Sequence, residues 1–156
     1  MVWVIDGILK WAPNGNATYN NFKLQGEYFH RKEDGTLTFD TAGAALSNGL
    51  SSRQSGWYAQ GVYQFLPQWR AGYRFDQLSS GTVNLDTSAS GLTAADFPIL
   101  ASYKPKKHSV MVDWNPSEFS RIRLQLARDY SRMGEPDNQM FLQYIVSLGA
   151  HGAHKF

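Results

Sequence analysis

The chain contains no cysteine, so neither a disulfide framework nor a thiolate metal site is available. It also has no apolar run of about 18 residues, which excludes a transmembrane helix but leaves open membrane strands of about 10 residues. Leucine-rich helical runs are missing as well. Lysine and arginine (15) nearly balance aspartate and glutamate (13), and the resulting net charge of +2 is too small to indicate nucleic-acid binding.

Sequence motifs for common enzyme chemistries are also missing. The chain has no Ser-His-Asp arrangement, no phosphate-binding loop and no dinucleotide fingerprint. We therefore expect that the protein is not an enzyme and needs no cofactor.

The residues that are abundant favour strands. The 156 residues, 42% of them hydrophobic, are enough for one domain with a sizeable core, so we expect a single domain over residues 1–156. Aromatic residues make up 14% of the chain, with eight Tyr and five Trp, and aromatic side chains are enriched in β-strands.

Hydrophobic alternation with a period of two predicts seven strands, each about as long as a tilted membrane strand. In the stretch "SRIRLQLARDY", for example, Ile122, Leu124 and Leu126 alternate with Arg121, Arg123 and other polar residues. The segments are 3–11, 22–31, 56–66, 69–76, 107–114, 120–130 and 140–149.

The connections between these segments alternate in length. Tight turns are expected at 13–16, 67–68 and 115–119, where Pro and Asn are concentrated. Long loops rich in Gly, Ser, Thr, Asp and Ala are expected at 32–55 and 79–106. Short turns at one end and long loops at the other are typical of an outer-membrane barrel.

The central question is which face of these strands meets water. A soluble sheet turns its apolar face into a core, whereas a membrane barrel turns that face toward lipid and its polar face toward the lumen. Large aromatic residues near the strand ends favour the membrane arrangement, because such residues form girdles at the lipid interface. The expected interface residues are Trp3, Trp11, Trp57, Trp69, Trp114 and Tyr130. The alternative is a soluble, lipocalin-like ligand-binding β-barrel.

In the membrane arrangement, charges of both signs face the lumen. We expect them to form a network that fills a small barrel, although the basic residues alone would make a track that attracts anions. The lumen-facing set is Lys23, Glu27, Arg70, Arg74, Asp76, Asp113, Arg121, Arg123 and Asp129.

Three stretches, "FKLQGEYFHRKEDG", "VDWNPSEFSRIRLQLARDYS" and "LQYIVSLGAHGAHKF", resemble the C-terminal region of a proteobacterial outer-membrane β-barrel family of the porin-like or zinc-regulated receptor-like kind. The C-terminal Phe156, preceded by hydrophobic residues at alternate positions, resembles the signal that the barrel-assembly machinery recognises on its substrates. The resemblance implies an antiparallel up-and-down transmembrane β-barrel in the bacterial outer membrane. It also implies contact with the lipid bilayer, lipopolysaccharide and the assembly machinery, and a passive pore or scaffold function.

Near the C-terminus, "HGAH" places His151 and His154 three residues apart. Two imidazoles at that spacing would ligate zinc if the tail turns, but on an extended strand they would face opposite ways. A solvated tail is the alternative.

The number of strands is odd, whereas bacterial single-chain barrels have even numbers. We therefore expect this chain to be the C-terminal portion of a larger barrel. The alternatives are an eighth strand recruited from residues 35–46, or self-association through the open strand edges, because unpaired backbone groups in lipid are costly.

Overall fold

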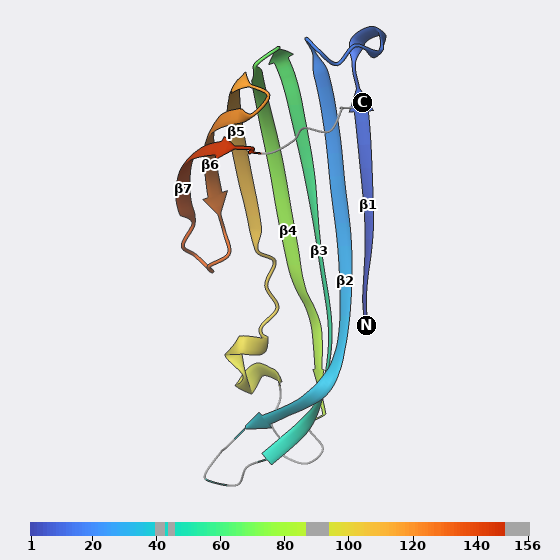
Figure 1. Cartoon of the computed structure of the whole chain (residues 1–156). Helices are drawn as coiled ribbons and strands as arrows, with labels where there is room; N and C mark the ends of the chain where they lie inside the picture. The colour runs from blue at the N-terminus through green and yellow to red at the C-terminus, as the bar shows by residue number, and fades with distance from the viewer. Residues whose placement is uncertain (40–42, 44–45, 87–93, 149–156) are drawn as a thin grey trace. The chain divides into compact units, whose positions relative to one another are not determined.

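A computed structural model describes residues 1–39, 43, 46–86 and 94–148. In this part of the chain seven strands form one sheet in sequence order, β1 to β7, with antiparallel neighbours (Figure 1). The predicted all-β, antiparallel up-and-down sheet is confirmed. The strands are β1 (Val2–Trp11), β2 (Asn21–Phe39), β3 (Leu46–Leu66), β4 (Trp69–Leu85), β5 (Lys106–Ser117), β6 (Ser120–Asp129) and β7 (Asp137–Val146).

Short 3₁₀ turns complete the described structure: η1 (Pro13–Gly15), η2 (Ala94–Asp96) and η3 (Pro98–Leu100). The first occupies the predicted turn at 13–16, where Asn14 and Gly15 adopt positive φ angles of 51° and 73°. Asparagine and glycine tolerate this left-handed conformation better than other residues. No helix among the described residues has the length and apolar character to cross a membrane.

The predicted loops at 32–55 and 79–106 are wrong in extent, because the strands run far into both. β2, β3 and β4 contain 19, 21 and 17 residues. Residues 35–39 belong to the end of β2 and Leu46 begins β3, so the described residues of the 35–46 stretch form no separate eighth strand. Composition misleads here, since Gly, Ser and Thr resemble loop sequence while pairing with a neighbouring strand satisfies the backbone. At Gly81 (φ +65°) a side chain would collide with the Arg53 carbonyl, so only glycine fits this strand approach.

The tight turns are shorter than predicted at one site. The turn at 67–68 is confirmed, but β5 continues through Pro116 and leaves only residues 118–119 as the turn to β6. The pairing register shifts between Trp114 and Ser117. Such a bulge accommodates Pro116, which has no N–H to donate to the ladder.

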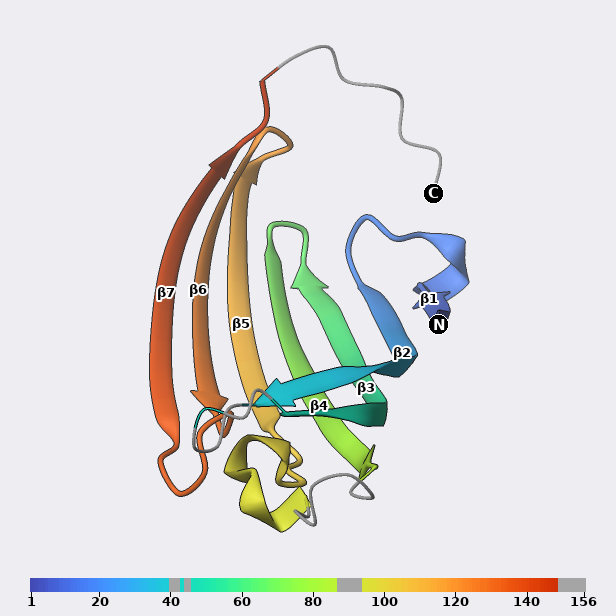
Figure 2. The same ribbon diagram turned by 90° about the horizontal axis from the view of Figure 1, so that it is seen from below.

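The residues group by their contacts into two compact units. The first comprises Met1–Ile5, Tyr28–Trp57 and Gln77–Pro105; the second comprises Asp6–Glu27, Tyr58–Asp76 and the chain from Lys106. In the first unit, η2 and η3 adjoin an edge-to-face contact of the Phe39 and Phe97 rings, whose centroids are 5.2 Å apart. In the second unit, β5, β6 and β7 lie side by side and curve in the same direction (Figure 2). The expectation of one domain stays a prediction.

Neither unit has an apolar core among its described residues. Of the hydrophobic side chains that the structure describes, only Ala127 is buried. The buried polar side chains are Asn48, Ser52, Gln64, Ser109 and Asp113, whereas most large hydrophobic residues are exposed. This distribution is the reverse of the one that soluble domains adopt.

The described sheet is open, with β1 and β7 as its edge strands. In an up-and-down sheet with an odd number of strands, the first and last run in the same direction. Direct pairing of β1 with β7 would therefore be parallel, unlike every other pair in the sheet.

Paired cysteines test whether these edges join. We expect the double variant Asp6→Cys/Ser147→Cys to form disulfides between chains and no efficient disulfide within a monomer, because the directions of β1 and β7 disfavour their pairing. Non-reducing gel electrophoresis of the folded protein in detergent gives the measurement, with each single cysteine variant as control. A strong intramolecular crosslink in the monomer would show that the sheet closes on itself.

Candidate functional site

Cross-strand pairing in the second unit sorts the side chains of β5, β6 and β7 into two faces. One row pairs Asp113 with Arg123 and Arg123 with Gln143, while the next row pairs Val112 with Leu124 and Leu124 with Leu142. Because successive side chains point to opposite sides of a strand, these rows lie on opposite faces of the sheet. We call the face of Asp113 the polar face and the face of Leu124 the apolar face.

The polar face is centred on the carboxylate of Asp113, whose side chain is 1% exposed. Arg123 donates two hydrogen bonds to it, from Nε to Oδ1 (2.7 Å) and from a terminal nitrogen to Oδ2 (2.9 Å). Arg121 Nε lies 3.7 Å from Oδ2 and donates to Asn115 Oδ1 at 2.8 Å. A two-pronged guanidinium–carboxylate pair combines charge with fixed geometry, and it satisfies a carboxylate that could not remain buried alone.

Arg70 and Gln64 continue the polar face onto β3 and β4. Arg70 Nε donates to Gln64 Oε1 at 3.0 Å, and the Gln64 amide donates to the carbonyl oxygens of Thr18 (2.8 Å) and Tyr19 (3.2 Å). Gln64 is 3% exposed, so its amide needs these partners. Among the described residues, Arg70 forms no ion pair with a carboxylate.

Two further charge pairs occupy the same face. Arg74 binds Asp76 at 2.6 Å, with its guanidinium 3.7 Å from the centroid of the Tyr58 ring. Lys107 Nζ lies 3.4 Å from Asp129 and donates to Gln139 at 2.8 Å. The polar face of the second unit therefore holds a chain of mostly neutralised charges.

Of the nine predicted lumen-facing residues, the structure joins seven in these contacts and places the other two, Lys23 and Glu27, as half-buried side chains on β2. The alternation pattern did not single out the amides Gln64, Asn115 and Gln139, which link the charged groups. Strand parity was the available signal, since Gln64 and Gln139 have the same parity as the charged residues of their sheet face.

The predicted interface tryptophans Trp3, Trp11, Trp57, Trp69 and Trp114 are all exposed, by 38–54%. In the second unit Trp69 and Trp114 stack with ring centroids 6.2 Å apart, and in the first unit Trp3 contacts the Tyr28 ring at 5.4 Å. Tyr130 is half-buried, and its ring centroid lies 6.2 Å from that of His108. Their contact with lipid stays a prediction.

Charges on the extended part of β2, in the first unit, are solvent-exposed. Arg31 pairs with Glu33 at 2.6 Å and Lys32 with Asp34 at 3.3 Å. Hydrogen bonds from the side chains of Ser51 and Lys32 favour the ionised form of Asp34, so the pKa of this carboxyl lies below its ordinary value.

Three predicted residues, His151, His154 and Phe156, lie outside the described residues. Within the described part of the chain, no three His, Asp or Glu side chains gather in a way that would hold a metal ion.

Comparison with known proteins finds one relevant relative. The chain is 29% identical over 143 residues to a protein of Aquifex aeolicus strain VF5 described as an uncharacterized protein, and the match covers 89% of this chain. The chain spans 28% of the length of that relative. No family model matches the chain, and no solved structure matches it.

The Asp113 pair provides a test of the polar face. We expect Asp113→Asn to lower the free energy of unfolding by about 3 kcal/mol, because it removes the buried counter-charge of the half-buried Arg123 guanidinium. The matched control, Asp76→Asn, removes a more exposed partner and should cost less than about 1 kcal/mol. Urea unfolding in detergent micelles measures both, and equal costs for the two variants would contradict the assignment of Asp113 as the centre of the network.

Proposed function

We propose that the protein is a β-barrel of the bacterial outer membrane, or a portion of one, that serves as a passive pore or membrane scaffold. One observation carries the proposal: most large hydrophobic side chains of the described sheet are exposed, whereas its buried side chains, apart from Ala127, are polar. Lipid is the solvent that suits such an exposed face.

The apolar face is difficult to reconcile with water. On β5–β7 it presents successive rows, Val110–Leu126–Met140 and then Val112–Leu124–Leu142, and each of these six side chains is exposed by at least 42%. Soluble monomers rarely expose contiguous apolar patches above a few hundred Å². A soluble, lipocalin-like barrel would instead turn these rows into its interior and leave the polar network outside.

Strand length and aromatic placement support the same proposal. β1, β6 and β7 contain 10 residues each, as a tilted membrane strand requires. The aliphatic rows of the apolar face have aromatic residues at both ends. Trp114 and Tyr144 lie at the end with the tight turns, and His108 and Tyr130 lie at the opposite end. Aromatic residues at both ends of an apolar band are typical of barrels in the outer membrane.

The open edges favour a chain that is completed by further strands. In lipid, each unpaired backbone group of β1 or β7 would cost several kcal/mol. We therefore propose that this sheet is part of a larger porin-like or receptor-like barrel, inserted by the barrel-assembly machinery and surrounded by lipopolysaccharide and phospholipid. The Aquifex relative, of which this chain spans 28%, has the length for additional strands.

The polar face favours a scaffold or weakly selective pore over a specific anion channel. Asp113, Asp76 and Asp129 each pair with a basic residue, so the arginines and Lys107 offer few free charges. An anion path would need a wall on which positive charge clearly exceeds negative charge.

A pair of neighbouring substitutions on β6 tests the lipid contact. Leu124→Arg places a charge on the apolar face and should lower the free energy of unfolding by about 2–4 kcal/mol, whereas Gln125→Arg, on the polar face, should have a much smaller effect. Folding into lipid vesicles, measured as heat-modifiable migration on gels, gives the comparison. Equal tolerance of the two variants would overturn the membrane proposal.

Conductance tests the role of the lumen. In planar bilayers we expect the purified protein to show no large, strongly anion-selective steps, because most of the positive charges on the polar face are paired with carboxylates. Reversal potentials in asymmetric salt measure the selectivity. Strong anion selectivity that disappears in Arg121→Ala/Arg123→Ala would refute the scaffold assignment.

A further inference from the structure

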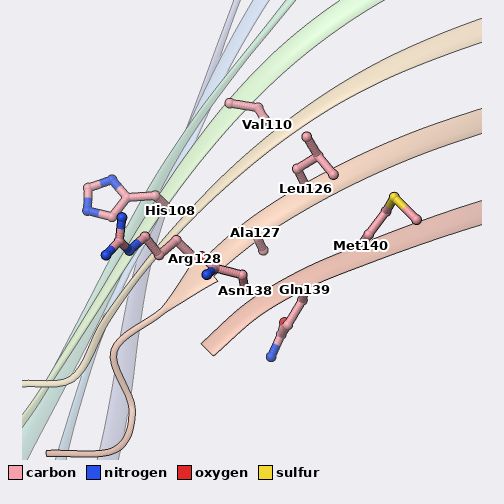
Figure 3. A pocket seen from close by; sticks show the side chains of 8 residues that line it. All are labelled: His108, Val110, Leu126, Ala127, Arg128, Asn138, Gln139 and Met140. Atoms are coloured by element: carbon pink, nitrogen blue, oxygen red, sulfur yellow. The ribbon is translucent and has the colours of Figure 1, made fainter. Parts of the chain in front are cut away.

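An open hollow of about 440 Å³ lies on the apolar face of the second unit, across β5, β6 and β7 (Figure 3). Six of its eight lining residues belong to two adjacent cross-strand rows, and the other two are Ala127 and Gln139. His108, Arg128 and Asn138 make up the row nearer the long loops, and Val110, Leu126 and Met140 make up the next. The lining of the hollow therefore changes from polar and basic in one cross-strand row to apolar in the next row on the same face.

Aromatic rings hold the basic end of this hollow in place. The Arg128 guanidinium lies 5.4 Å and Lys106 Nζ 5.2 Å from the centroid of the Tyr130 ring. The Tyr73 hydroxyl is hydrogen-bonded to His108 Nδ1 at 2.8 Å, and Phe75 contacts the same imidazole ring at 4.9 Å. Stacking on aromatic rings orders the long basic side chains without neutralising them.

The acidic residues of the same strand ends do not neutralise this end. Asp129 has the opposite strand parity from Arg128 and pairs with Lys107, while Asp137 accepts a hydrogen bond from Gln139. Among the described residues, neither Lys106 nor Arg128 forms an ion pair. The hollow thus has a positively charged end, with no carboxylate among the residues that line it.

We propose that this hollow binds an anionic membrane lipid, with the lipid phosphate at Arg128 and Lys106 and an acyl chain along Val110, Leu126 and Met140. The inference rests on the proposed function, since it requires the apolar face to lie in lipid. Arginine and lysine bind phosphate through charge-assisted hydrogen bonds, and basic groups at a membrane surface attract anionic headgroups. Charge complementarity selects the headgroup, and the apolar row selects a lipid over a soluble phosphate.

Native mass spectrometry of the folded protein in dodecyl maltoside micelles tests the proposal with phosphatidylglycerol, phosphatidylcholine and inorganic phosphate as probes. We expect one retained phosphatidylglycerol, weaker retention of phosphatidylcholine and no retained inorganic phosphate. Arg128→Gln and Lys106→Gln should each weaken phosphatidylglycerol binding about five-fold, as expected for one basic group at a membrane surface. Arg128→Lys should preserve most of the binding.

Lys10→Gln is the matched control, because it removes one exposed positive charge from β1 and should leave binding unchanged. Equal retention of phosphatidylcholine, equal binding of inorganic phosphate, or equal effects of Arg128→Gln and Lys10→Gln would each overturn the lipid site. Heat-modifiable migration of each variant shows first that it folds. A wild-type protein that fails to fold in micelles and vesicles contradicts the proposed function, whereas a folded protein without preference for phosphatidylglycerol contradicts this site alone.

Discussion

The buried carboxylate of Asp113 is the group on which the polar face of the second unit depends. A carboxylate that is 1% exposed is stable only with its charge compensated, and Arg123 compensates it with two hydrogen bonds. Arg121 forms an ion pair with the same carboxylate at 3.7 Å, and its Nε donates a hydrogen bond to Asn115 Oδ1. Asn115 near the end of β5 and the facing positions 113 and 123 on β5 and β6 are therefore linked to one buried charge.

The apolar face of the sheet follows from the same arrangement. Side chains alternate between the two faces along each strand. Because Asp113 of β5 and Arg123 of β6 lie on the polar face, their neighbours Val112 and Leu124 lie on the apolar face. A one-residue slip of β6 against β5 would exchange the faces and leave the charges without partners, so the ion pair fixes the register as well as the face. In the proposed setting, lipid outside and polar contacts inside then stabilise the same register.

The backbone imposes a further constraint that the side chains do not meet. β1 and β7 are the edges of the described sheet, and their outward N–H and C=O groups need partners. In lipid that need becomes strict, because no water is present to satisfy them. A membrane environment would therefore account both for the exposed apolar face and for the need of further strands. In that environment, the basic end of the hollow on β5–β7 would lie where the acyl chains end and the lipid headgroups begin.

The sequence by itself determined the seven strands and which residues of each strand share a face, because side-chain alternation is a local property of each strand. Strand length was missed at 32–55 and 79–106, since extended pairing there depends on a neighbouring strand and not on local composition. The sequence also placed Asp113, Arg121 and Arg123 on one face without indicating which carboxylate is buried. Only the tertiary structure decided that Asp113 takes Arg123 as its partner and that amides such as Gln64 join the network, because burial and hydrogen bonding arise when strands distant in sequence are placed side by side.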